Sequence, residues 1–219
     1  MIPRNCEVAI FDMDGTIVDS LGIWEKIDQK FLEEKRGIKV PRDYVHAIAA
    51  MSYREIAEYT IKRFNLPDTP EELMQEWTDM AIHEYTYNIG LKPYAREYME
   101  LLKARGMKIA LCTSSPSFFY EPALKSNGVY ELFDAFATTC DAGVGKNSSE
   151  VFLLCAQRTG VSPDKCIVFE DTVQAAQSAK NAGMTVCGVY DERNRDIQEK
   201  LKNICDYYVT GFHEIMEER

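Results

Sequence analysis

Asp12 and Asp14 are the residues of this sequence whose type and spacing best suit chemistry. They stand two positions apart in Phe-Asp-Met-Asp-Gly-Thr, directly after the apolar segment Glu7–Phe11, which we expect to be a buried strand. Two carboxylates at one strand end can divide into a nucleophile and a general acid/base. A calcium loop does not fit, because the twelfth position from Asp12 is Ile23 rather than Glu, and because a strand precedes the motif.

Five further polar residues follow later apolar segments or lie in a glycine-containing loop: Thr113, Ser114, Lys146, Glu170 and Asp171. Each alone has a simpler explanation: a helix cap for the hydroxyls, a surface position for the lysine, and a helix N-terminus for the acidic pair. A P-loop is excluded, because Cys140 stands at its first Gly position and Asn147 at its Ser/Thr position. Their joint occurrence with the two aspartates at strand ends predicts one site.

Short apolar segments recur along the second half of the chain and predict four more strands: Lys108–Cys112, Ala135–Thr138, Cys166–Phe169 and Thr185–Val189. Helical patterns lie between them, such as Ala95–Arg105 and Ser149–Thr159, each followed by Gly. This alternation predicts an α/β fold, a Rossmann-like parallel sheet flanked by helices. Such sheets bind ligands at the carboxyl ends of their strands.

The region after the first strand breaks this alternation. It holds only amphipathic helical patterns, at Trp24–Arg36, Tyr53–Phe64 and Glu71–Tyr87. Helical sequence of this length is too long for an ordinary crossover, which needs little more than a dozen residues. We therefore expect an inserted all-helical cap domain over residues 19–90, and an α/β core domain made of residues 1–18 and 91–219.

Several of these segments resemble the motifs of the haloacid dehalogenase superfamily, in the order that the family has them. Asp-x-Asp-Gly-Thr after a hydrophobic strand resembles the first motif, and Leu111–Ser115 resembles the second. Lys146 matches the lysine of the third, and Phe169–Thr172 resembles the fourth. The match spans essentially the whole chain and is most similar to the phosphatase and β-phosphoglucomutase-like branch.

The resemblance implies a Mg²⁺-dependent phosphatase of small phosphorylated metabolites, either sugar phosphates or nucleotides. By this likeness, Asp12 attacks phosphorus and forms an aspartyl-phosphate, and Asp14 is the general acid/base. Thr113, the Ser114 amide and Lys146 would bind the phosphoryl oxygens.

The same resemblance implies the metal ligands: the Asp12 carboxylate, the Asp14 backbone carbonyl and Asp171, with Glu170 close by or acting through water. The four acidic side chains bring up to four negative charges to one place, and a phosphate monoester adds nearly two more. Unneutralised, they would protonate or repel the substrate. Mg²⁺ and Lys146 supply three positive charges, and an all-oxygen ligand set suits Mg²⁺ better than zinc.

The sequence departs from the family pattern at two informative places. Asn147-Ser148-Ser149 replaces the usual proline-bearing turn, and we expect the serines to cap the helix that begins near Glu150. Trp24 stands where mutases of this branch carry a histidine, which favours hydrolysis over mutation.

The predicted cap domain contains residues that indicate a function less clearly than the motifs above do. Arg54 falls where relatives place an arginine that contacts the substrate, although an ion pair with Glu58 four residues on explains it equally well. The aromatic residues of the cap either line a pocket or fill its interior, and for most of them we expect the interior: Trp24, Trp77, Tyr85 and Tyr87.

Three alternatives to the phosphatase remain open at this stage. A β-phosphoglucomutase-like mutase would pass the phosphoryl group to a second hydroxyl. A non-catalytic homologue would bind a phosphorylated metabolite without turnover. The presence of both Asp12 and Asp14 argues against this alternative. A phosphonate-cleaving enzyme would need a cap lysine, for which Lys26 and Lys30 are the candidates.

The overall composition narrows the partners. The 219 residues carry a net charge of −10, which disfavours nucleic acid and anionic lipid. No apolar run approaches the ~20 residues of a membrane span, and we expect a cytoplasmic monomer. Seven cysteines without a Cys-x-x-Cys pair predict free thiols, and three scattered histidines argue against a zinc enzyme or a Ser-His-Asp hydrolase.

Overall fold

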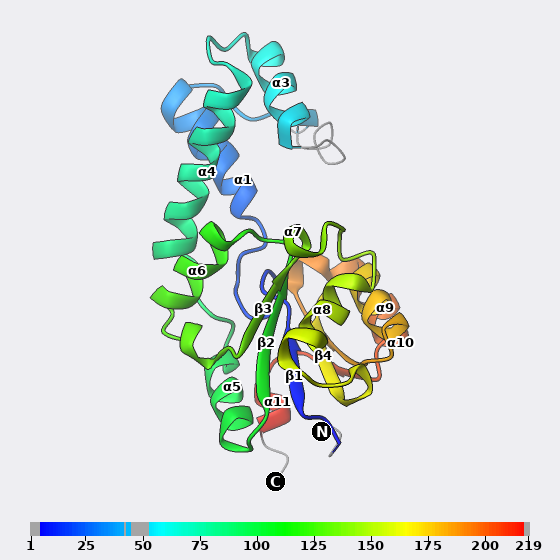
Figure 1. Cartoon of the computed structure of the whole chain (residues 1–219). Coiled ribbons are helices and arrows are strands. Elements are labelled where there is room, and N and C mark those ends of the chain that lie inside the picture. The colour runs from blue at the N-terminus through cyan, green and yellow to red at the C-terminus, as the bar shows by residue number, and fades with distance from the viewer. Residues whose placement is uncertain (1–4, 42, 45–52, 217–219) are drawn as a thin grey trace. The chain divides into compact units, whose positions relative to one another are not determined.

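The computed structural model describes residues 5–41, 43–44 and 53–216. The chain divides into two compact units, one formed by residues 1–21 and 89–219 and the other by residues 22–88. The first is an α/β unit and the second is helical (Figure 1). In the chain, the helical unit is inserted between the first and second strands. Among the described residues, no helix is both long and apolar enough to cross a membrane.

The α/β unit is built on a six-stranded sheet with the strand order β3-β2-β1-β4-β5-β6, and every neighbouring pair is parallel. The strands are β1 (Val8–Phe11), β2 (Lys108–Thr113), β3 (Ala135–Thr138), β4 (Cys166–Glu170), β5 (Thr185–Val189) and β6 (Tyr207–Val209). The predicted fold class is confirmed. The edge strand β6 was not predicted, because it is three residues long and only Val209 in it is buried.

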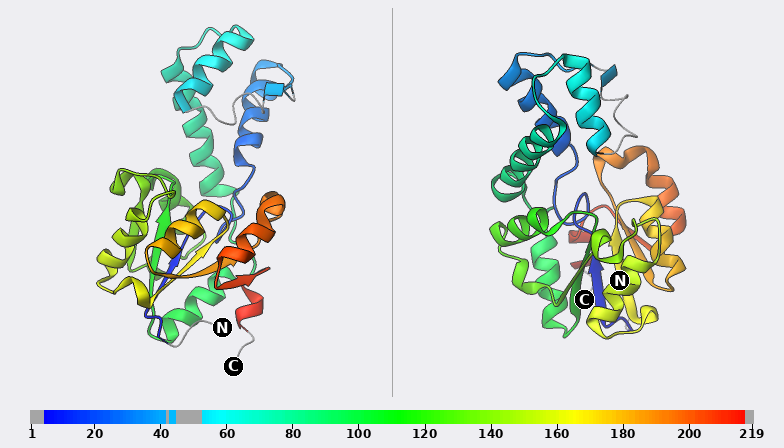
Figure 2. Two further views of the ribbon diagram at one scale, coloured as in Figure 1. Left: turned by 90° about the vertical axis from the view of Figure 1, so that its right-hand side faces the viewer. Right: turned by 45° about the horizontal axis from the view of Figure 1, so that its top comes forward.

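Helices lie on both faces of this sheet, and the views in Figures 1 and 2 agree on this. They are α5 (Ala95–Ala104), α6 (Ser117–Ser126), α7 (Thr139–Ala142), α8 (Glu150–Thr159), α9 (Val173–Asn181), α10 (Gln198–Ile204) and α11 (His213–Met216). Three short 3₁₀ segments join them: η2 (Tyr130–Leu132), η3 (Pro163–Lys165) and η4 (Glu192–Ile197).

The two faces of the central strands bury different side chains, because successive residues of a strand point to opposite sides. Val8 and Ile10 pack into an aliphatic core with α8 and α9. On the other face, Phe11 stacks on Phe169 of β4 with ring centroids 4.6 Å apart, and Tyr98 packs edge-on at 5.6 Å from Phe169. This packing fixes β1 against β4, with Phe11 paired to Phe169, so the residues that follow both strands lie side by side.

The prediction of free thiols is confirmed, and four of the cysteines that lie in apolar segments are also buried: Cys112, Cys155, Cys166 and Cys187. The order of the sheet also reverses at β1, since the chain runs from β1 outward through β2 and β3 and then returns to β4 on the other side. Such a switch point is where open α/β sheets bind ligands, at the carboxyl ends of the strands.

The helical unit contains α1 (Ile23–Asp28), the π-helical segment η1 (Gln29–Glu34), α3 (Tyr53–Phe64) and α4 (Pro70–Tyr87). A capping box starts α4: the Thr69 hydroxyl accepts from the Glu72 amide, and the Glu72 carboxylate accepts from the Thr69 amide. Buried residues recur at every fourth position of α4 and form its inner face: Leu73, Trp77, Ala81 and Tyr85.

Among the four cap aromatics, the expected interior position holds for two. Trp77 and Tyr85 are buried, whereas Trp24 and Tyr87 are exposed. The predicted helix over residues 24–36 is divided in the structure into α1 and η1.

Candidate active site

Asp12 lies immediately after β1 and is held at the edge of the sheet. Its backbone N–H donates to the Phe169 carbonyl of β4 at 3.0 Å, which continues the parallel ladder by one residue. The Asp12 side chain is only 9% exposed, so its carboxylate lies in a largely water-excluded position. The apolar residues of β1 and β4 therefore place this acid against the end of the neighbouring strand.

Lys146 joins the ends of β1 and β4. Its ammonium group donates to Oδ1 of Asp12 and, at 2.8 Å, to Oε2 of Glu170. The second oxygen of Glu170 accepts from the Thr172 amide at 3.1 Å and from the Thr172 hydroxyl at 2.9 Å, at the start of α9. Both oxygens of Glu170 are thus engaged, one by the lysine and one by the turn into α9.

Asp171 is buried and held by residues far away in the sequence. The Thr16 hydroxyl donates to its Oδ1 at 3.3 Å, and the Asn194 amide donates to its Oδ2 at 2.5 Å. Gly15 passes so close that a Cβ there would lie 2.5 Å from Oδ2 of Asp171, and its φ of +81° also favours glycine. The Gly-Thr of the first motif therefore serves to bring the turn after β1 against this acid.

The charges of this cluster act on one another. Burial, together with the charges of Glu170 and Asp14, raises the pKa of Asp12 to about 7 despite the opposing effect of Lys146. Burial, together with the charges of Glu170 and Asp12, raises the pKa of Asp171 to about 9. Burial disfavours the charged Lys146, but the two acids outweigh it and raise the lysine pKa well above its usual value. The ionised forms of the two aspartates therefore lack sufficient positive charge nearby.

Asp14 sits differently from Asp12. It is half-buried, and two serine hydroxyls hold its carboxylate: Ser20 donates to Oδ1 at 2.6 Å and Ser115 donates to Oδ2 at 2.7 Å. Ser20 follows β1 and Ser115 follows β2, so the loops after two neighbouring strands fix the orientation of this acid. An oriented, partly accessible carboxylate beside a buried one can exchange protons with a bound molecule.

Thr113 ends β2 and is fully buried, and its hydroxyl accepts from the Ser115 amide at 3.0 Å. Ser114 next to it is exposed.

The expectation that serines cap the helix after Lys146 is wrong for Ser149: it occupies the N-cap position of α8 but makes no capping bond. Its hydroxyl donates to the Ser178 carbonyl of α9 at 2.9 Å instead, because the two helices pack together.

Arg54 belongs to the helical unit and lies on α3. It is exposed and pairs with Glu58 through Nε at 3.2 Å and with Glu71 through Nη2 at 2.8 Å. The i,i+4 pair considered from the sequence is present, and α4 supplies a second acidic partner. A contact between Arg54 and a substrate stays a prediction.

The acidic cluster suits a hard divalent cation. Asp12, Glu170 and Asp171 each offer an oxygen, and these oxygens lie within 4.8 Å of one another. All three residues are buried, and Lys146 is the one cation that bonds directly to the cluster among the described residues. An all-oxygen donor set with surplus negative charge fits Mg²⁺ and does not favour zinc, for which nitrogen or sulfur donors are typical.

Four residues that hold the site were not recognised in the sequence: Thr16, Ser20, Ser115 and Asn194. The first three lie within or just after the motifs, so their positions carried a weak signal. Asn194 lies in η4, where nothing in the local sequence marks it.

A second set of contacts fixes η4. Lys92 pairs with Asp191 at 2.7 Å and donates to the Tyr190 carbonyl at 3.0 Å. The Gln198 amide donates to the Asn194 carbonyl at 2.8 Å. These contacts hold the start and middle of η4, and with them the side chain that reaches Asp171.

A parallel sheet with carboxylates gathered at its switch point defines an α/β enzyme that acts at the carboxyl edge of the sheet. A family model for haloacid dehalogenase-like hydrolases matches residues 6–183. The chain therefore belongs to the haloacid dehalogenase-like hydrolases, and the resemblance stated from its motifs is confirmed.

Individual relatives are phosphatases. The chain is 26% identical over 178 residues to a phosphorylated carbohydrates phosphatase of Thermotoga maritima, covering 81% of this chain and 82% of that protein. It is 30% identical over 180 residues to a fructose-1-phosphate phosphatase of Escherichia coli, covering 82% and 94%. Among solved structures, a putative β-phosphoglucomutase from Thermotoga maritima superposes with a TM-score of 0.79 at 25% identity, covering 93% and 94%.

Proposed function

We propose that this protein is a Mg²⁺-dependent phosphatase of small phosphorylated metabolites, with phosphorylated sugars and sugar alcohols preferred over nucleotides. The observation that carries the proposal is the pair of carboxylates after β1. Asp12 is buried against Lys146, and Asp14 is separately oriented by two hydroxyls. The family membership and the names of the relatives support the same reaction.

The residues that would hold Mg²⁺ are the Asp12 carboxylate, the Asp14 backbone carbonyl and Asp171. When bound, the ion would neutralise the surplus negative charge and polarise the phosphoryl oxygens. Glu170 has a different task in this proposal, because both of its oxygens are already engaged. It holds Lys146 in place and anchors the start of α9, and it contributes to the metal site through its charge.

The reaction proceeds in two displacements at phosphorus. A carboxylate oxygen of Asp12 attacks and forms an aspartyl-phosphate, while the bond to the leaving oxygen breaks and Asp14 donates a proton to that oxygen. Asp14 then takes a proton from water as the water attacks the aspartyl-phosphate, which releases inorganic phosphate and restores Asp12. Lys146, the Thr113 hydroxyl and the Ser114 amide stabilise the charge on the equatorial oxygens.

A phosphosugar mutase is the second candidate, because a putative β-phosphoglucomutase shares the fold over nearly the full length. Hydrolysis is favoured by the phosphatase relatives and by Trp24, which replaces the histidine that the mutases of this branch carry. A mutase would need a bisphosphate activator and would release little phosphate.

Phosphate release with Mg²⁺ tests the proposal. The panel contains hexose phosphates, hexitol phosphates and nucleoside monophosphates, measured with the wild type and with Asp12→Asn. We expect release by the wild type and a loss of at least about 10³-fold in kcat for the variant. Asp164→Asn, an exposed aspartate of η3, is the matched control and should retain the rate.

Two outcomes would contradict the proposal. Conversion of glucose 1-phosphate to glucose 6-phosphate without phosphate release, when a bisphosphate is added, would identify a mutase. Mg²⁺ binding without turnover of any substrate would identify a non-catalytic binding protein.

A further inference from the structure

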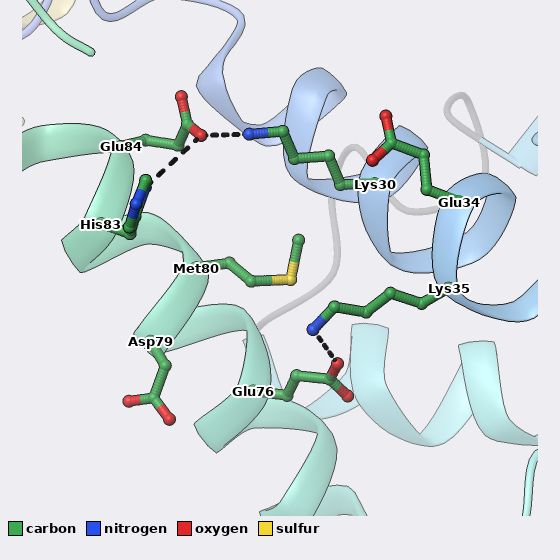
Figure 3. Close-up of a pocket in the computed structure, with 8 residues that line it drawn as sticks. All are labelled: Lys30, Glu34, Lys35, Glu76, Asp79, Met80, His83 and Glu84. Atoms are coloured by element: carbon green, nitrogen blue, oxygen red, sulfur yellow. Dashed lines mark hydrogen bonds and ion pairs between the residues drawn. The ribbon is translucent and has the colours of Figure 1, made fainter. Parts of the chain in front are cut away.

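The helical unit has a hollow of about 380 Å³ that is lined mainly by charged residues from the region of η1 and from α4 (Figure 3). Its two lysines are already paired: Lys30 with Glu84, and Lys35 with Glu76 at 2.6 Å. Because acids of the same unit already neutralise these lysines, the hollow gives no reason to expect an anionic ligand. The segment of the α/β unit that carries Lys146 is more informative.

Lys146 lies between α7 and α8, in a segment that we call the lysine loop (residues 143–149). The loop contains two glycines and no proline, so its backbone has little intrinsic stiffness. Four of its residues are exposed: Gly143, Val144, Gly145 and Asn147. Burial of these residues therefore does not fix the loop, and individual hydrogen bonds must hold the lysine in place.

Among the described residues, two side chains of the lysine loop donate hydrogen bonds to other segments. Lys146 donates to Asp12 and to Glu170. Ser149 donates through its hydroxyl to the Ser178 carbonyl of α9 at 2.9 Å. The loop is thus attached once by charged partners and once by a neutral partner.

The bond of Ser149 closes a circuit of contacts behind the site. Thr172 occupies the N-cap position of α9, and both its amide and its hydroxyl donate to Glu170. Ser178 belongs to the same helix. The lysine loop is therefore connected to Glu170 in two ways, directly through Lys146 and indirectly through Ser149 and α9.

These two connections differ in how they respond to a bound molecule. Lys146 bonds to carboxylates whose charge a cation or a phosphoryl group would balance or oppose, so the bonds of the lysine change with the state of the site. The Ser149 hydroxyl and the Ser178 carbonyl are neutral and do not belong to the acidic cluster. Their bond can keep the loop in place while the bonds of the lysine change.

The hydroxyl of Ser149 serves this tertiary contact instead of its own helix. A serine at an N-cap usually has extended backbone angles, and its hydroxyl accepts from an amide of the first turn. Ser149 has helical angles, with φ −74° and ψ −18°, and makes no capping bond. Its hydroxyl is therefore available as the donor to α9.

We propose that Ser149 is a positioning residue for Lys146: its bond to α9 holds the lysine loop where the ammonium group meets the phosphoryl oxygens. The inference rests on the proposed function, in which Lys146 stabilises the charge on those oxygens. Ser149 does not touch the phosphoryl group in this role and acts through Lys146.

Substitution of the hydroxyl tests this role, with p-nitrophenyl phosphate as the probe. Ser149→Ala should lower kcat/KM by about three- to tenfold, the loss that corresponds to one neutral hydrogen bond. Ser149→Thr keeps a hydroxyl and should remain within about twofold of the wild type. Ser148→Ala is the matched control, because Ser148 bonds to the Gly145 carbonyl through its backbone amide, which the substitution leaves intact. Urea unfolding checks that each variant is folded.

A double-mutant cycle distinguishes positioning from a general structural role. In the Lys146→Met background, Ser149→Ala should change kcat/KM by less than about twofold, because the lysine that Ser149 positions is absent. A full further loss of about three- to tenfold in that background would overturn the inference, since the effect would not pass through Lys146. An equal loss in Ser149→Ala and Ser149→Thr would overturn it as well.

Binding of inorganic phosphate separates this inference from the proposed function, because it needs no turnover. In calorimetric titrations with phosphate in the presence of Mg²⁺, we expect Ser149→Ala to bind phosphate about three- to tenfold more weakly and Ser148→Ala to bind as the wild type does. If the wild type hydrolyses no substrate but this difference is found, the proposed function fails and the positioning role stands. If the wild type hydrolyses p-nitrophenyl phosphate and Ser149→Ala equals it in both assays, the positioning role fails while the phosphatase stands.

Discussion

Charged side chains are balanced differently in the two units. In the helical unit, acids and bases pair at or near the surface, as Lys35 does with Glu76 and Arg54 does with Glu58 and Glu71. In the α/β unit, three carboxyl groups are buried around the single ammonium group of Lys146. Those surface pairs neutralise one another without any other molecule, whereas the ionised carboxyl groups of the buried cluster outnumber the one ammonium group that bonds to them.

This difference separates charges that are neutralised in pairs from charges that a bound cation would neutralise. An exposed pair contributes about 0–1 kcal/mol to stability, because water screens it and the side chains lose freedom when they pair. A buried excess of one sign costs stability unless a partner of opposite sign arrives. The α/β cluster therefore has the properties of a site for a cation and a substrate, which is why its raised carboxyl pKa values carry functional information.

Removal of divalent metal should have the largest effect. With EDTA we expect phosphate release to fall by at least about 10³-fold and to return on addition of Mg²⁺, because the surplus charge of the cluster then opposes an anionic substrate. The measurement is phosphate release before and after chelation. Full activity in EDTA would contradict the assignment of the acidic cluster as a metal site.

Replacement of a lysine in each unit makes the comparison quantitative. Lys146→Met should lower kcat/KM by about 10²–10³-fold and destabilise the fold by roughly 3–5 kcal/mol, because it leaves two buried carboxyl groups without their partner. Lys35→Met removes an exposed pair and should cost less than about 1 kcal/mol with no change in activity. Urea unfolding and phosphate release report both effects. Equal destabilisation by the two variants would contradict the distinction between the units.

Asn194 should act through Asp171 rather than on the substrate. Without its hydrogen bond the acid loses one of its two anchors, so Asn194→Ala should weaken Mg²⁺ binding by about 10–100-fold. Calorimetric titration with Mg²⁺ measures this without substrate. Asn181→Ala, at the exposed end of α9, is the control, and a Mg²⁺ affinity equal in both variants would refute the positioning role.

The smallest predicted effect concerns Asp28. Folding raises its pKa from 3.8 to about 6, so its ionised form destabilises the folded state, and stability falls as pH rises through this interval. The free energy of unfolding of Asp28→Asn should therefore exceed that of the wild type by about 1–2 kcal/mol at pH 8. Most of this difference should be absent at pH 4. Urea unfolding at both pH values tests this. If Asp28→Asn is stabilised by the same amount at pH 4 as at pH 8, the charge of Asp28 is not the cause of the stabilisation.

The sequence predicts the position of the site better than it predicts the residues that hold the site in place. Strands with buried runs, such as Cys166–Glu170, are recognisable from composition, and the polar residues after them necessarily meet at one edge of a parallel sheet. Asn194 was missed, because it reaches Asp171 from a 3₁₀ segment whose position depends on the tertiary fold. Ser149 was misassigned, because a packing contact with α9 outweighs a local capping preference.

In the helical unit too, the sequence predicts the helices but not the surroundings of a single side chain. Its helices follow from periodicity, and α3 has the predicted bounds. Asp28 has no mark in the sequence, since a lone aspartate in an amphipathic segment is usually solvated. In the structure it is half-buried and lines one hollow with Trp24, Tyr53, Ile56 and Trp77.

If Asp12 is the nucleophile, as we propose, a phosphoryl group should be found on it during turnover. Asp14→Asn should form the aspartyl-phosphate from p-nitrophenyl phosphate, whose leaving group needs no proton, and should hydrolyse it slowly. We expect a burst of roughly one nitrophenolate per protein molecule and a phosphorylated peptide containing Asp12 after an acid quench. Steady release without a burst, with no phosphorylated peptide, would contradict it and indicate direct attack by water.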